Sequence, residues 1–127
     1  MACGIRLAEA GRSCAIVSQG QSALHLSSGS FDLLGRLPDG QPVTDPLAGI
    51  ASLEESDPQH PYALIGAAAC AAYAAEAPEL LRRAGIRVAG DCRRNHWRIT
   101  PMGKAKAAWL TIDGYLAAPE PGTLPIR

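Results

Sequence analysis

The stretch CAIVSQGQSALHLSSGSFDLLG, residues 14–35, joins an apolar run to a long segment of small polar residues. Residues 14–17 are apolar throughout, which is typical of a short strand whose two faces are both covered. Residues 18–35 contain five serines, three glycines and a single histidine. These side chains are too small and polar to form a core. The stretch therefore predicts a buried strand followed by a loop that could hold a ligand.

Two helices are expected in the first half of the chain, on either side of this stretch. Residues 2–10 can place apolar side chains on one face, and Gly11 is a natural C-terminal stop. Asp45 is followed by a proline, which is the usual order of an N-cap and the first helical residue. We expect this second helix to run to about Glu55.

The second half of the chain predicts a long helix and then short strands. Residues 67–84 are rich in alanine and favour a helix, with a kink or a division into two helices at Pro78. A short strand is expected at residues 86–89. Residues 96–100 and 107–112 then flank a turn sequence, which is typical of a hairpin-like arrangement.

The alternation of helices and strands predicts the α/β class, with a parallel sheet. The first element is a helix, although a helix that leads into a parallel strand normally follows an earlier strand. The chain also contains no G-x-G-x-x-G motif. The chain therefore looks as if it begins in the middle of a βαβ unit, without the strand that would precede its first helix. With that strand missing, residues 14–17 should be under-covered and the isolated chain marginally stable.

Composition and charge exclude several classes of function. The chain has 127 residues, of which twelve are basic and twelve acidic, so its net charge gives no reason to expect nucleic acid or an anionic membrane surface as a partner. No apolar run is long enough to span a bilayer, and residues 1–6 do not resemble a signal peptide. We expect a cytosolic protein with reduced cysteines.

The four cysteines do not predict a metal site. No two of them form a C-x-x-C pair, and only Cys92 and His96 stand at a spacing that a helix could use for two ligands. The preferred interpretation is that the cysteines are small buried apolar residues. No metal ligand is assigned.

The end of the expected strand at residues 14–17 bears on the type of cofactor. In dinucleotide-binding folds the second strand usually ends in a carboxylate that binds the adenosine ribose, but here the next residue is Ser18. This argues against an adenine dinucleotide in its usual pose and is compatible with a mononucleotide. The hydroxyls and glycine N–H groups of the loop suit a phosphate or a flavin ring. A solvated serine-glycine loop is the alternative.

Three segments resemble one known family. Residues 14–45 (CAIVSQGQSALHLSSGSFDLLGRLPDGQPVTD), residues 60–65 (HPYALI) and residues 98–103 (RITPMG) are similar to the B subunit of anaerobic glycerol-3-phosphate dehydrogenase. The similarity extends over about residues 3–112 in the same order. The family is related to the flavin domains of fumarate reductase and succinate dehydrogenase. The resemblance implies an incomplete Rossmann-like α/β domain of the FAD/NAD(P)-binding type with an added β-hairpin, lacking the first strand and its glycine-rich turn. It places this partial flavin-binding domain at residues 1–116 and a proline-rich tail or linker at residues 117–127.

The resemblance also implies a cofactor and its contacts. The family is described as carrying non-covalent FMN, and Ser18 in place of the carboxylate is consistent with FMN rather than FAD. By position, residues 20–22 match the segment that holds the phosphate and ribitol in related flavin domains. Residues 27–30 match the segment that passes the isoalloxazine ring. The cofactor-binding residues expected are Ser18, Gly20, Gln21, Ser22, Ser27, Ser28, Gly29 and Ser30.

The activity implied by the resemblance is the oxidation of glycerol 3-phosphate to dihydroxyacetone phosphate in anaerobic glycerol metabolism. Electrons would pass to quinone through other subunits of a membrane-associated complex, which places the protein in the cytoplasm, peripheral to the inner membrane. The alternative is a truncated, non-catalytic α/β fragment that binds no flavin and only packs against a partner.

Few individual residues stand out as catalytic, and none is assigned that role. His25 could contact a flavin, although a histidine that caps loop carbonyls is the preferred interpretation. Arg98 has the forked donors that suit a phosphate monoester, with a solvated arginine as the preferred alternative. Arg93 and Arg94 are expected on a solvated face.

Overall fold

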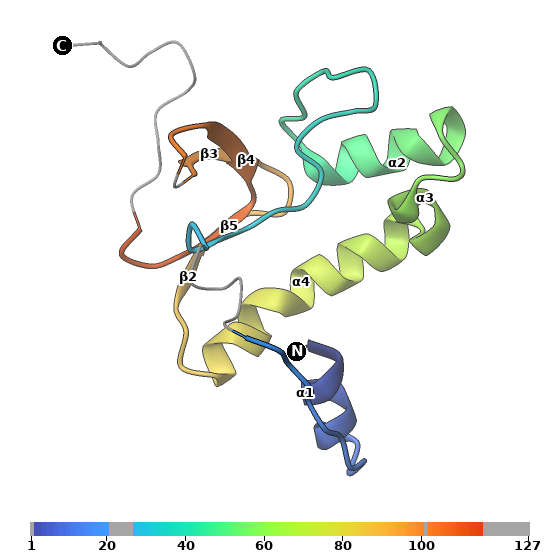
Figure 1. Ribbon diagram of the computed structural model, residues 1–127. Helices are drawn as coiled ribbons and strands as arrows, with labels where there is room; N and C mark the ends of the chain where they lie inside the picture. Colours follow the sequence, from blue (N-terminus) through green and yellow to red (C-terminus); the bar gives the residue numbers. More distant parts are fainter. Residues whose placement is uncertain (1, 21–26, 101, 116–127) are drawn as a thin grey trace, which may run out of the picture.

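The computed structural model of the protein describes residues 2–20, 27–100 and 102–115 (Figure 1). In chain order the helices and strands are α1 (Ala2–Glu9), β1 (Ser30–Phe31), α2 (Pro46–Ser56), α3 (Pro61–Ile65), α4 (Ala67–Arg83), β2 (Val88–Gly90), β3 (His96–Ile99), β4 (Ala105–Ala108) and β5 (Leu110–Ile112). The expected tail at residues 117–127 lies outside the described residues.

Two small antiparallel sheets lie beside the helices in the described part of the chain. One has the strand order β1-β5-β2, and β3 pairs with β4 in the other. Ser30 is opposite Thr111 in the first sheet, and Trp97 is opposite Ala107 in the second. The hairpin therefore uses β4 as its second strand, and β5 turns away to join the other sheet. All of these pairs are antiparallel, so the expected parallel pairing does not occur between the described strands.

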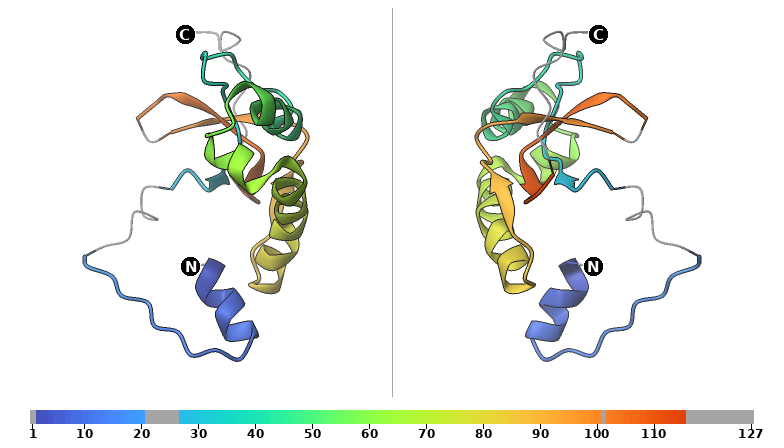
Figure 2. Two further views of the ribbon diagram at one scale, coloured as in Figure 1. Left: turned by 90° about the vertical axis from the view of Figure 1, so that its right-hand side faces the viewer. Right: turned by 90° about the vertical axis from the view of Figure 1, so that its left-hand side faces the viewer.

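The prediction of a buried strand at residues 14–17 is wrong. The segment is extended but pairs with no other described strand, and Ile16 and Val17 are 72% and 94% exposed. Figure 2 shows residues 11–20 passing away from the body of the molecule after α1. A strand is stabilised by its ladder of hydrogen bonds to a neighbour, so four apolar residues without a neighbour remain an exposed segment.

The helix predictions were closer to the structure. Asp45 caps α2 by accepting from the N–H groups of Leu47 and Ala48, both at 3.0 Å. The long helix α4 continues through Pro78, so the expected division into two helices is not observed. The helix α3 was missed, although His60 followed by a proline is the same type of start signal, and the His60 ring accepts from Tyr62 N–H at 3.2 Å.

Two clusters of buried apolar side chains hold these elements together. The first lies between α2, α3 and α4 and contains Leu34, Ile50, Leu53 and Cys70. The second joins α4 to β5 through Ala74, Trp109 and Leu110. Leu33 packs against both clusters, so the segment after β1 connects the helices to the sheet.

The helix α1 is attached to the rest of the described chain mainly through charged side chains. Arg6 pairs with Glu76, and Glu9 pairs with Arg83 at 3.0 Å, both on α4. All four side chains are about half exposed, and such pairs contribute roughly 0–1 kcal/mol each. No residue of α1 belongs to either apolar cluster. This region is therefore less firmly anchored than the helices that share the core.

Candidate functional site

The serines and glycine just before and within β1 form a compact turn. Ser28 and Ser30 place their hydroxyl oxygens 2.7 Å apart, and the Gly29 N–H donates to the Ser27 hydroxyl at 3.1 Å. The turn is fixed to the sheet because Ile112 N–H donates to Gly29 O at 2.7 Å. These contacts hold four of the residues predicted to contact a cofactor in one place.

Gly29 is required at its position by conformation and by space. Its φ is +68°, which disfavours other residues, and it is buried. A Cβ at this position would lie 2.9 Å from ring carbons of Tyr115. A side chain on residue 29 would therefore displace the tyrosine ring.

Arg98 lies beneath this turn. It is 5% exposed, and its Nη2 donates to Ser28 O at 3.0 Å. The guanidinium carbon is 5.6 Å from the centre of the Tyr115 ring. The preferred expectation of a solvated arginine is therefore wrong, because the long side chain folds back from β3 to the turn before β1 and not outward. Arg93 and Arg94 are exposed, as predicted.

His96 extends the same cluster towards β5. It is two residues before Arg98 on β3, so both side chains leave the same face of the strand. His96 Nε2 lies 2.6 Å from Thr111 Oγ1, and Thr111 is opposite Ser30 in the sheet. Burial of the ring, and then the positive charge of Arg98, lower the pKa of His96 below its ordinary value. At neutral pH the imidazole is uncharged.

A small cavity of about 170 Å³ borders this cluster. His96, Thr111 and Tyr115 form one side of it, and Ala89, Gly90 and Ile112 complete the lining. Cofactor pockets usually have volumes of about 300–1,000 Å³, so this cavity suits a small ligand rather than a whole dinucleotide.

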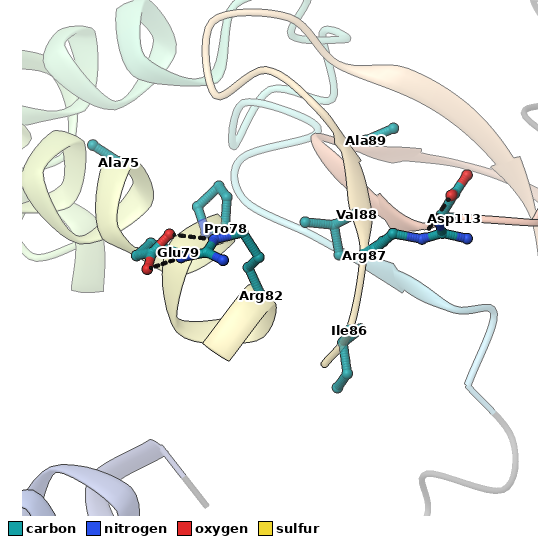
Figure 3. Close-up of a pocket in the computed structure, with 9 residues that line it drawn as sticks. All are labelled: Ala75, Pro78, Glu79, Arg82, Ile86, Arg87, Val88, Ala89 and Asp113. Atoms are coloured by element: carbon teal, nitrogen blue, oxygen red, sulfur yellow. Dashed lines mark hydrogen bonds and ion pairs between the residues drawn. The ribbon is translucent and has the colours of Figure 1, made fainter. Parts of the chain in front are cut away.

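A second, wider pocket of about 590 Å³ lies between α4 and β2 (Figure 3). Its charged side chains pair with one another: Arg82 with Glu79 at 2.8 Å, and Arg87 with Asp113 at 3.4 Å. None of the residues predicted to bind a cofactor lines it. We therefore take the cluster around Arg98 as the candidate site.

The remaining predicted contacts are not part of this cluster. Ser18 and Gly20 lie in the exposed segment that follows α1. Gln21, Ser22 and His25 lie outside the described residues. The signal for Arg98, His96 and Thr111 in the sequence was weak, because each is a single polar residue in a short strand. The pairing of β1 with β5 brings Thr111 to the serine-glycine turn, and side-chain contacts from β3 bring Arg98 and His96 there.

Among the described residues, no group of three or more histidine, cysteine, aspartate or glutamate side chains could hold a metal ion. Cys70 is buried, as predicted for an apolar role, but Cys3 and Cys14 are exposed and Cys92 is only half-buried. The expectation that all four cysteines are buried is therefore wrong. None of the described helices has the length and apolar character needed to cross a membrane.

Comparison with known families defines the class of protein. The family described as the FAD binding domain matches residues 1–125, and the chain belongs to this family. This membership implies a Rossmann-like α/β fold for the complete domain.

Several curated relatives are named as the B subunit of anaerobic glycerol-3-phosphate dehydrogenase, which confirms the resemblance found in the sequence. The protein from Pectobacterium carotovorum subsp. carotovorum (strain PC1) is 54% identical over 90% of this chain and 27% of its own length. One from Yersinia pestis is 48% identical over 98% of this chain and 30% of its own length. The chain thus spans under a third of the length of these relatives. No solved structure matches the chain.

The expected cofactor, FMN, is contradicted by the family, which points to FAD. The expectation rested on the family resemblance and on Ser18 as the residue that ends a sheet strand next to the ribose. Since residues 14–17 pair with no described strand, Ser18 is not at a strand end, and its identity gives no information about the ribose.

The described residues fit one part of a flavin. The turn at residues 27–30 offers small side chains with exposed or half-buried hydroxyls that a flavin could contact, and Gly29 itself is buried against Tyr115. Arg98 adds a buried positive charge below this turn. These residues could hold the ring region of FAD, which would supply two-electron redox chemistry when bound.

Proposed function

We propose that this chain supplies part of the flavin-binding region of a dehydrogenase subunit that oxidises glycerol 3-phosphate to dihydroxyacetone phosphate. Electrons would pass to quinone through partner subunits at the inner membrane. The oxidation removes a hydride and a proton from a secondary alcohol, and bound FAD would accept the two electrons. The names and 54% identity of the relatives support this proposal.

The observation that carries the proposal is the cluster of Ser28, Gly29 and Ser30 around Arg98. The turn supplies small residues, and β3 brings a buried positive charge and a neutral histidine next to it. The histidine also contacts Thr111 on β5. This combination suits a flavin ring and an anionic substrate better than a solvated loop. Catalytic residues are not assigned.

Flavin retention is the first test. The purified protein should contain FAD, identified by chromatography after release from the protein, and should reduce an artificial acceptor when glycerol 3-phosphate is added. Gly29→Val should lose the flavin, since the new side chain would occupy the turn and displace Tyr115. Arg94→Ala, on the exposed side of the same region, should retain it. A colourless parent protein would contradict the proposal.

The second candidate function is a non-catalytic chain that packs against a partner without flavin. The exposure of Ile16 and Val17 favours it, because exposed apolar segments often mark contact surfaces. The same experiment separates the two functions. A colourless protein that is recovered only together with a partner chain would support the non-catalytic function.

A further inference from the structure

Arg98 has more hydrogen-bonding capacity than the described residues use. Its Nη2 donates to Ser28 O, but Nε and Nη1 are buried and have no hydrogen-bond partner among the described residues. No carboxylate in the described ranges forms an ion pair with it. A buried charge without a counter-charge is strongly unfavourable, so an arginine in this state calls for an anionic ligand.

The guanidinium is held in place before any ligand arrives. Its one hydrogen bond fixes it to the backbone of the turn, and its central carbon lies over the Tyr115 ring. A guanidinium so fixed presents its remaining N–H groups in a set direction, which suits an oxyanion with two oxygens in reach. Lysine would supply a point charge without this geometry.

The adjoining cavity indicates the size of the ligand. Its volume of about 170 Å³ is below that of ordinary cofactor pockets, and His96, Thr111 and Tyr115 line it. Tyr115 therefore contacts both the cavity and Arg98, and it is 52% exposed. Arg98 does not itself line the cavity, so a ligand there reaches Nε and Nη1 only if the Tyr115 ring moves aside.

We propose that Arg98 binds the phosphate group of a small phosphate monoester through Nε and Nη1, and so determines the substrate class of this site. The identity of that monoester as glycerol 3-phosphate rests on the proposed function. Neutral His96 and the Thr111 hydroxyl form the adjoining wall, where they can contact the hydroxyl groups of such a ligand.

The test uses the full-length, FAD-loaded protein with inorganic phosphate and glycerol 3-phosphate as probes. Binding is followed by the change in flavin absorbance and by the rise in melting temperature with added phosphate. Arg98→Met should retain its flavin and lose at least tenfold in affinity for both probes, and Arg98→Lys should lose less. Arg94→Gln, an exposed arginine nearby, should leave both affinities unchanged.

The outcomes separate this inference from the proposed function. A parent protein that binds phosphate through Arg98 but does not oxidise glycerol 3-phosphate would contradict the function and support the inference. An Arg98→Met protein with unchanged phosphate affinity would overturn the inference, even if the parent is active. Both Arg98 variants could also lose flavin while the protein that still holds FAD keeps its phosphate affinity. That result would overturn the inference, because Arg98 would then bind the cofactor and not the substrate. If Arg98→Met does not fold, equal phosphate affinity of Arg98→Lys and the parent would overturn it.

Discussion

His96 Nε2 and Thr111 Oγ1 lie 2.6 Å apart, which links β3 of one sheet to β5 of the other. The two strands belong to separate ladders, so this side-chain pair is a direct polar connection between them. It also places a titratable group beside the candidate site.

The lowered pKa of His96 should make the stability of the folded protein depend on pH. Because its pKa in the folded protein is lowered by burial and by Arg98, the unfolded chain binds a proton more readily than the folded one. The contribution of His96 to the free energy of unfolding is therefore complete above its pKa in the unfolded chain, about 6.5, and is lost as the pH falls from there towards its pKa in the folded protein. Melting temperatures between pH 5 and pH 8 should show this loss, and His96→Gln should reduce it. An unchanged profile in the variant would contradict this assignment.

Gly90 should be among the least replaceable residues of β2. Its φ is +143°, and a Cβ there would lie 1.9 Å from the carbonyl oxygen of Trp109 in the neighbouring segment. Gly90→Ala must therefore push β2 away from β5 and should cost about 3–5 kcal/mol in the free energy of unfolding. Urea denaturation measures this loss. Gly40→Ala is the control, because its φ is also positive but no atom lies within 4 Å, and it should cost about 1–2 kcal/mol.

Asn95 should be a strong determinant of stability outside the apolar clusters. Its Nδ2 donates to Leu34 O at 2.9 Å and to Val43 O at 2.7 Å, so one amide holds both ends of a loop. Asn95→Ala leaves both carbonyls without this donor and should cost about 1–3 kcal/mol. Asn95→Asp should cost more, since a carboxylate would face two carbonyl oxygens. The midpoint of chemical denaturation checks the order, and Arg93→Ala, which is exposed, should have little effect.

Asp45 should contribute to stability through its cap on α2. Because its carboxylate accepts from two backbone N–H groups at 3.0 Å, Asp45→Ala should cost about 0.5–2 kcal/mol. Asp45→Ser should restore most of the loss, since serine is also a good N-cap. Thermal melts of the three proteins test this. Equal losses for alanine and serine would show that the charge, and not the cap, is responsible.

The helices were predictable because their signals are local. Asp45 with its following proline fixes the start of α2 at its observed position, and α1 ends at Glu9, close to Gly11. The alanine-rich segment gives α4 almost to its end. In each case the capping residue and the helix lie within a few residues of each other, so the sequence contains both partners of the interaction.

The sequence also predicted β2 in part and the start of the β3–β4 hairpin, whose strands are close in the chain. The sheet of β1, β5 and β2 and the candidate site depended on tertiary structure, because their partners are distant in the chain. The apolar residues 14–17 looked like a strand, but strand formation needs a neighbour, and none of the described residues supplies one. The sequence by itself determined helices α1, α2 and α4, the family resemblance and the serine-glycine segment. Only tertiary structure decided that the turn lies over Arg98 and that this arginine is buried, through the pairing of Ser30 with Thr111 and the hydrogen bond from Arg98 to Ser28 O. A hydrogen bond between distant residues leaves no pattern in a single sequence, which is why Arg98 was expected in solvent.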